Sequence, residues 1–326
     1  MGTKNYQESS GARVLKSDTC IVDTHPEDSY AKNYQNDSSS TLKDYFALTK
    51  PGVTSLVVFS SITGMVLAPG KINLFIAIIS IFATYLGSAS AASINMWYDI
   101  DIDSIMQRTQ KRPTVRGIIK PDDAITFGVT LGFASVFIMA VFVGYLPAFL
   151  LIFSILFYVF YTVYLKRYTP QNIVIGGISG AVPPMIGYAS VTNSINEVAI
   201  ILFLIIFFWT PAHFWALSLY RSEDYRKANI PMMPIVRGDR YTKIQIIIYA
   251  FLTFLSSLSI CIFYNTSLFY VASATILGGK FVIDSIALLS DTENKRAPKL
   301  FGYSIAYLFL LFGSLLIEDV KLRLFS

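Results

Sequence analysis

The sequence predicts an all-α integral membrane protein in which about nine transmembrane helices form one bundle. Composition is the first reason: 54% of the 326 residues are hydrophobic and 14% are charged, whereas soluble domains carry about 25% charged residues. The second reason is a series of apolar runs, each long enough for a membrane-spanning helix of about 20 residues. Third, the sequence lacks the two-residue alternation of apolar and polar side chains that is typical of a membrane β-barrel.

Nine apolar runs qualify as spans. They cover residues 52–69, 73–96, 122–144, 146–165, 172–190, 197–219, 243–263, 267–289 and 299–317. The fifth run contains three closely spaced glycines and the pair Pro183-Pro184, which predict close packing and a kink. In the eighth run, Lys280 and Asp284 stand one helical turn apart, which favours a mutually neutralising pair inside the bundle.

Basic residues are concentrated in every second loop, and the loops between carry almost none. They are Arg108, Lys111, Arg112, Arg116 and Lys120 after the second span, Lys166 and Arg167 after the fourth, Arg221, Arg226, Lys227, Arg237, Arg240 and Lys243 after the sixth, and Lys295, Arg296 and Lys299 after the eighth. By the positive-inside rule these loops and the N-terminus are cytoplasmic, and the C-terminus lies outside. The net charge of +5 is too small to indicate nucleic-acid binding.

Residues 1–41 differ from the rest of the chain because they are rich in Ser, Asn, Asp and Lys. They contain no apolar core typical of a secretory signal, and such a composition predicts a disordered cytoplasmic tail. Residues 42–326 are the predicted transmembrane domain. The two cysteines do not have the spacing of a metal site or a disulfide framework.

Three oxygen-bearing side chains follow one another at the end of the second span. Asn95, Asp99 and Asp103 are spaced four residues apart, and a step of four drifts by only about 40° around a helix. They therefore form one stripe on a helix face, while Asp101 lies on another face. Mg²⁺ prefers oxygen ligands and is often completed by substrate phosphates. We expect this stripe to hold Mg²⁺ and, through it, a diphosphate.

The segment that follows the stripe is strongly basic. Arg108, Lys111 and Arg112 come within ten residues of Asp103. Arginine binds phosphate oxygens in pairs, and lysine acts as a point charge. Positive-inside anchoring would explain these cations alone, but the acidic stripe beside them favours a diphosphate site.

Several motifs in this order resemble the UbiA superfamily of intramembrane prenyltransferases. NMWYDIDIDSIMQRTQKRP at 95–113 is similar to its NxxxDxxxD motif and looks most like the heme-farnesylating branch. The segments at 48–53 (LTKPGV), 161–188 (YTVYLKRYTPQNIVIGGISGAVPPMIGY) and 207–238 (FFWTPAHFWALSLYRSEDYRKANIPMMPIVRG) resemble the same branch. The resemblance covers roughly residues 42–326 and implies one UbiA-like helical bundle.

The loop after the sixth span is a second candidate constellation. Asp224 can supply a further metal oxygen, and Arg221 and Lys227 can meet phosphate. Many superfamily members carry another aspartate four residues later, but this chain has Ala228, a departure that favours the heme branch. Lys166, in the loop after the fourth span, is either a positive-inside anchor or a further diphosphate ligand.

His213 is the only histidine outside the tail, and Trp209 and Trp215 flank it. One interpretation is a contact to heme iron, for which imidazole is suited. The other is an interfacial histidine in an aromatic belt.

The resemblance implies a Mg²⁺-dependent enzyme that transfers the farnesyl group of farnesyl diphosphate to heme b in a bacterial inner membrane. Partners would include the lipid bilayer and heme A synthase or the terminal oxidase assembly. Two alternatives stay open: a related enzyme with an aromatic quinone precursor as acceptor, and a transporter whose acidic stripe binds an ion. The acids gather at one membrane face, which argues against transport.

Overall fold

The structure is a computed structural model that describes residues 40–325, and these contain helices but no strand. The prediction of a disordered tail over residues 1–41 lies almost wholly outside the described residues. The helices are α2 (Leu42–Leu48), α3 (Pro51–Leu67), α4 (Leu74–Tyr98), α5 (Ile100–Ile105), α6 (Pro121–Phe142), α7 (Tyr145–Phe160), the π-helical turn η1 (Tyr161–Leu165), α8 (Lys166–Tyr168), α9 (Asn172–Ala181), α10 (Pro183–Thr192), α11 (Glu197–Tyr220), α12 (Ser222–Lys227), α13 (Met233–Arg237), α14 (Asp239–Phe263), α15 (Leu268–Leu289) and α16 (Ala297–Phe325).

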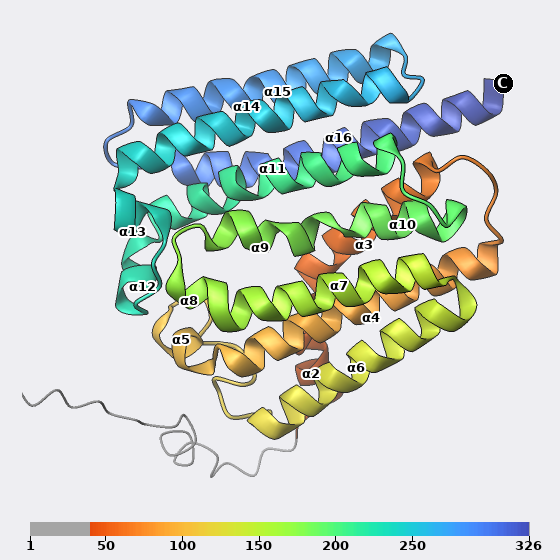
Figure 1. Cartoon of the computed structure of the whole chain (residues 1–326). Coiled ribbons are helices and arrows are strands. Elements are labelled where there is room, and N and C mark those ends of the chain that lie inside the picture. Colours follow the sequence, from red (N-terminus) through yellow and green to blue (C-terminus); the bar gives the residue numbers. More distant parts are fainter. Residues whose placement is uncertain (1–39, 326) are drawn as a thin grey trace, which may run out of the picture.

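The predicted membrane spans are confirmed. Among the described residues, eight helical segments are long and apolar enough to cross a membrane, and the bent pair α2 and α3 makes a ninth if it counts as one span. The long helices lie side by side, and the short helices α5, α8, α12 and α13 gather at one edge of the bundle (Figure 1). The C-terminus lies at the opposite edge.

A sharp bend of 57° separates α2 from α3. Lys50 forms the bend with a left-handed backbone conformation, φ 48°. Pro51 begins α3, where its missing N–H costs no helical hydrogen bond and its fixed φ suits the first turn. The Lys50 side chain lines the cavity described below.

The fifth span has a break where the proline pair predicted a kink: α9 ends at Ala181 and α10 begins at Pro183. Beyond the break, α10 packs against α3 with backbones almost in contact. A Cβ at Gly64 would lie 1.9 Å from the carbonyl oxygen of Pro184, and one at Gly187 would lie 1.8 Å from the carbonyl oxygen of Ser61. Only glycine permits this approach, the usual device where membrane helices pack tightly.

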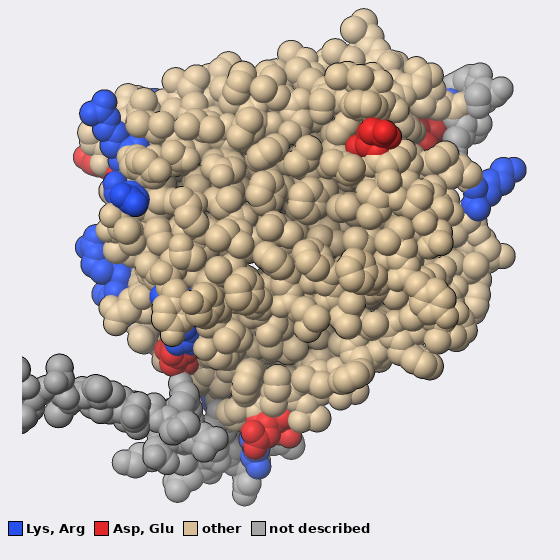
Figure 2. Space-filling view, viewed as in Figure 1, with Lys and Arg blue, Asp and Glu red and all other residues tan. Residues whose placement is uncertain are grey.

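On the face shown in Figure 2, charged residues lie mainly at the edges of the bundle, and the band between them is almost free of charged residues. For Lys280 and Asp284, the sequence predicted a mutually neutralising pair inside the bundle. They form an ion pair, and the Lys280 ammonium lies 4.4 Å from the centre of the Tyr303 ring. Their side chains are 54% and 35% exposed, so the expectation of a pair inside the bundle is wrong. The pair lies on the outward face of α15, whose inward face carries the buried Phe281.

Candidate active site

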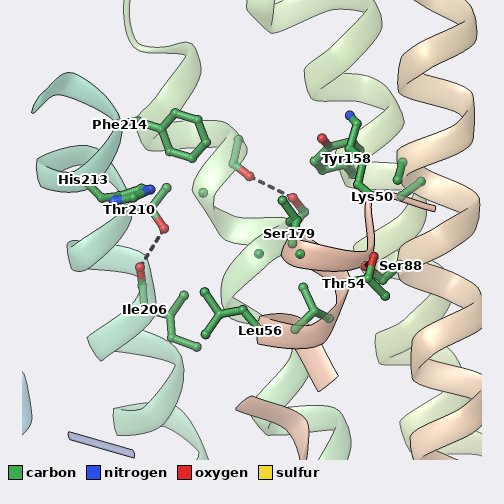
Figure 3. Close-up of a pocket in the computed structure, with 18 of the residues that line it drawn as sticks. Lys50, Thr54, Leu56, Ser88, Tyr158, Ser179, Ile206, Thr210, His213 and Phe214 are labelled. Atoms are coloured by element: carbon green, nitrogen blue, oxygen red, sulfur yellow. Dashed lines mark hydrogen bonds between the residues drawn. The ribbon is translucent and has the colours of Figure 1, made fainter. Parts of the chain in front are cut away.

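A cavity of about 970 Å³ lies between the helices. Its charged and amide lining residues are Lys50, Asn95, Asp103, Arg108, Arg112 and Lys166. The rest of the wall is largely apolar or hydroxylic and comes from α3, α4, α7, α9, α10, α11 and α16. Figure 3 shows Lys50 and Tyr158 on one side of this space, with His213 and Phe214 on the other. The cavity thus has a charged part and an apolar part.

The acidic stripe keeps its helical register although α4 ends at Tyr98. The backbone N–H of Asp99 donates to the carbonyl of Asn95 at 3.0 Å, and that of Asp103 donates to the carbonyl of Asp99 at 2.8 Å. These bonds carry the four-residue spacing through the junction of α4 and α5. All three side chains are buried, and Asn95 Nδ2 donates to Asp99 Oδ2 at 2.6 Å.

Basic side chains from distant segments meet this stripe. Lys166 Nζ donates to Asp99 Oδ2 at 2.5 Å, and Lys50 donates to Asn95 Oδ1. A buried carboxylate requires such partners because removing it from water is costly. The charge that the sequence assigned to Mg²⁺ is therefore also met by lysine in the protein itself.

Asp103 is paired with Arg112 from the loop that follows α5. Burial raises the pKa of the Asp103 carboxyl, while the positive charges of Arg112 and Lys166 oppose that rise. Asp103 and Arg112 both line the cavity. The predicted acid–base arrangement is thus present as a direct ion pair.

The π-helical turn η1 brings α8 to the stripe. It widens the end of the helix begun by α7, and such insertions occur frequently at functional sites. Thr162 Oγ1, within the turn, accepts from Asn95 Nδ2 at 3.3 Å, and Lys166 follows directly. Gly176 on α9 makes room for this turn, because a Cβ there would lie 2.3 Å from the Tyr161 ring.

Asp101 points away from the stripe, as its position in the sequence predicted. Arg167 holds its two carboxylate oxygens at 2.7 and 2.8 Å. Partial burial works to raise the pKa of Asp101, but the hydrogen bond and charge of Arg167 leave it below the ordinary value. This pair joins α5 to α8 outside the cavity and stabilises the junction that carries Lys166.

The loop after α11 reaches the same cavity through Tyr225. This side chain lines the cavity and shares a hydrogen bond with Arg108. Burial raises the pKa of Tyr225, and the positive charge of Arg108 partly offsets this rise. Its neighbour Asp224 is also buried, with Arg221 Nη1 at 3.8 Å from its Oδ2. The structure thereby links the two loops that the sequence singled out.

Some predicted ligands lie outside the cavity wall. Lys111, Arg221 and Lys227 are exposed, and neither they nor Asp99 and Asp224 line the cavity. Their roles stay predictions.

Sequence reasoning missed Lys50 as a site residue. The only signal was its place in the LTKPGV segment, which contains no partner acid.

The oxygen atoms at this site fit a hard divalent cation. Asp99 Oδ1 and Asp224 Oδ2 are buried and have no hydrogen-bond partner, although a buried carboxylate oxygen normally needs one. Their arginine partners are at ion-pair distance only: Arg167 Nη2 is 3.9 Å from Asp99 Oδ1, and Arg221 Nη1 is 3.8 Å from Asp224 Oδ2. Among residues 40–325, no group of three or more His, Cys, Asp or Glu side chains could hold a metal by itself. The donor set therefore needs the Asn95 amide and a ligand from outside the protein, as expected for Mg²⁺ bound with a phosphate.

A membrane-embedded helical bundle around a cavity with a cation- and oxygen-lined part and an apolar part is typical of enzymes that act on lipid diphosphates. The chain belongs to the UbiA prenyltransferase family, whose model matches residues 57–313. It is 53% identical over 279 residues to the protoheme IX farnesyltransferase of Rickettsia akari (strain Hartford), covering 85% of this chain and 92% of that relative. The protoheme IX farnesyltransferase of Rickettsia canadensis (strain McKiel) is 50% identical over 291 residues, 89% and 95% of the two chains.

Solved structures share the fold. A digeranylgeranylglyceryl phosphate synthase superposes with a TM-score of 0.73 at 19% identity, covering 86% of this chain and 99% of that one. A UbiA homologue from Archaeoglobus fulgidus, bound to GPP and Mg²⁺, gives a TM-score of 0.59 at 14% identity, covering 83% and 99%.

Proposed function

We propose that the chain transfers the farnesyl group of farnesyl diphosphate to a vinyl group of heme b, giving heme O and diphosphate. The choice of heme b as the acceptor rests on sequence identity. The chain is 50–53% identical, over nearly the full length of each relative, to proteins named protoheme IX farnesyltransferase. The cavity supports the donor, because it joins a charged part to an apolar part suited to an isoprenoid chain.

The diphosphate would lie at the charged part of the cavity. Arg108 and Arg112 can each donate two hydrogen bonds to phosphate oxygens. Lys50 and Lys166, which now donate to Asn95 and Asp99, would turn to the diphosphate when it binds. The exposed Lys111, Arg221 and Lys227 would attract the anionic diphosphate from solution. A cleft lined by charges of one sign raises the local concentration of an oppositely charged substrate.

Asn95, Asp99, Asp103 and Asp224 are the proposed ligands of Mg²⁺. Bound there, Mg²⁺ stabilises the negative charge that develops on the departing diphosphate. The chain's own contribution is to hold these oxygens in a buried, preorganised array with cations beside them. The two carboxylate oxygens without hydrogen bonds support this assignment.

The reaction breaks the bond between C1 of the farnesyl chain and its diphosphate oxygen. A carbon–carbon bond forms between C1 and the terminal vinyl carbon, a water oxygen adds to the inner vinyl carbon, and one proton is released. Tyr158, Tyr161 and Phe214 line the cavity. Their ring faces would stabilise the allylic cation and exclude other water molecules.

Heme b would occupy the part of the cavity lined by His213. This imidazole is buried, lines the cavity and lies across from Lys50 and Tyr158 (Figure 3). The position favours the contact to heme iron over the interfacial-belt alternative, because a belt histidine would face the lipid headgroups.

The test uses purified full-length protein in nanodiscs with heme b, farnesyl diphosphate and Mg²⁺. Mass spectrometry of the porphyrin should detect heme b plus one farnesyl group and one hydroxyl group. An aromatic quinone precursor serves as the competing acceptor. Exclusive prenylation of that compound would overturn the heme assignment, and solute movement without diphosphate release would point to transport.

We place this reaction at the cytoplasmic face of a bacterial inner membrane, with the C-terminus outside. The basic loops and the short helices share one edge of the bundle (Figures 1 and 2), which supports this orientation under the positive-inside rule. The domain boundary near residue 42 and an association with heme A synthase or the terminal oxidase assembly stay predictions.

A further inference from the structure

His213 is held from both sides by aromatic rings. Its imidazole stacks on Trp209 with centroids 4.3 Å apart and planes 15° apart, and on Phe301 at 4.4 Å and 22°. The three residues come from α11 and α16, and all three line the cavity. The stack fixes the plane of the imidazole, but it does not decide which ring nitrogen carries the proton.

Ser304 on α16 makes that choice. Its hydroxyl oxygen lies 2.6 Å from His213 Nδ1 and 2.6 Å from the carbonyl oxygen of Phe301, to which it donates. A hydroxyl has one hydrogen, and a carbonyl can only accept. The hydroxyl hydrogen is therefore used on Phe301, and His213 must donate its own Nδ1–H to Ser304. In the neutral ring, Nε2 then carries the free lone pair.

The backbone of Ser304 supports the same arrangement. Its carbonyl oxygen accepts a 2.8 Å hydrogen bond from Trp209 Nε1. One residue thus fixes the stacking partner through its backbone and the tautomer through its side chain. Ser304 is completely buried, so water does not compete for either bond.

We propose that Ser304 is a positioning residue for the acceptor substrate: it holds His213 as the Nδ1–H tautomer so that Nε2 presents its lone pair to the iron of heme b. The inference rests on the proposed function, since it takes heme b as the acceptor. Histidines that bind iron or other metals commonly donate their second ring N–H to a fixed acceptor, which orients the ring and raises its basicity.

The experiment is a heme b titration of the full-length protein in nanodiscs, followed by the visible absorption spectrum of the bound heme. Ser304→Ala should weaken heme affinity by about 10- to 100-fold, the usual effect of removing such a partner, and should change the iron-coordination bands. Ser304→Thr keeps the hydroxyl and should restore both. Ser314→Ala is the matched control, because Ser314 is buried on the same helix and donates to Leu311 in the same way; it should behave as wild type.

A double-mutant cycle separates positioning from general packing. In a His213→Ala background, Ser304→Ala should cause no further loss of heme affinity, since its effect passes through the imidazole. An equal loss in both backgrounds, or a wild-type spectrum in Ser304→Ala, overturns the inference. If His213→Ala binds heme as wild type does while heme O still forms, the inference fails and the proposed function stands. If the wild-type protein neither binds nor prenylates heme b, both fail.

Discussion

The ammonium group of Lys166 donates a 2.5 Å hydrogen bond to Oδ2 of Asp99, whose side chain is completely buried. The two residues are 67 positions apart in the sequence. The pair keeps a membrane-depth carboxylate compensated before any substrate is present. Because ammonium also binds phosphate, the same lysine can exchange its partner when a diphosphate enters. The acidic stripe is thus stable and remains able to bind ligands.

Replacing Asp99 tests the metal role of the stripe. Asp99→Ala should abolish turnover, and Asp99→Asn should lower kcat by at least about 100-fold, the scale expected when one preorganised electrostatic group is lost. Heme O formation is the measurement, with membrane insertion checked by fractionation. Asp123→Asn is the control, because Asp123 is exposed on α6 and does not line the cavity, and it should remain active. Turnover near wild type in Asp99→Asn would refute the assignment.

Lys50 should contribute to substrate affinity rather than to folding. A hydrogen bond to a charged group is worth about 1.5–3 kcal/mol, so Lys50→Met should weaken binding of farnesyl diphosphate by about 10- to 100-fold. Lys50→Arg should retain most of the affinity. Binding of a non-reactive farnesyl diphosphate analogue measures the effect, and Lys43→Met, an exposed lysine on α2, is the control. Unchanged affinity in Lys50→Met would exclude the proposed contact.

Metal removal should stop the reaction without unfolding the protein. Asp99 and Asp103 already have basic partners in Lys166 and Arg112. Removing the metal therefore leaves neither carboxylate without a positive charge beside it. EDTA should abolish heme O formation, and added Mg²⁺ should restore it, while the unfolding temperature in EDTA stays that of the untreated protein. Full turnover after exhaustive chelation would contradict the metal requirement. A large drop in unfolding temperature would instead indicate a structural metal.

The contact between α3 and α10 should be intolerant of a single methyl group. Gly64→Ala places a Cβ 1.9 Å from the Pro184 carbonyl oxygen, and such overpacking costs about 1–3 kcal/mol or more. Gly279→Ala is matched in type but meets no atom within 4 Å, so it should be neutral or stabilise by about 0.5–1 kcal/mol through reduced backbone freedom. Unfolding in detergent micelles measures both. Equal stability of the two variants would show that the helices can separate at Gly64.

The sequence by itself determined the features that depend on local periodicity. Apolar runs of bilayer length predicted the spans, and the Pro183-Pro184 pair predicted a kink at the place where α9 gives way to α10. The spacing of Asn95, Asp99 and Asp103 placed them on one stripe, because helical geometry repeats within a few residues. The motifs around them were sufficient to suggest the family.

Only the tertiary structure decided which distant side chains meet. Lys50 reaches Asn95 across 45 positions, and Ser304 reaches His213 across 91. No local pattern encodes such pairs, since they arise where separate helices pack. The same limit explains the error at Lys280 and Asp284: their spacing predicted the ion pair correctly, but which face of α15 turns outward depends on its packing against α14 and α16.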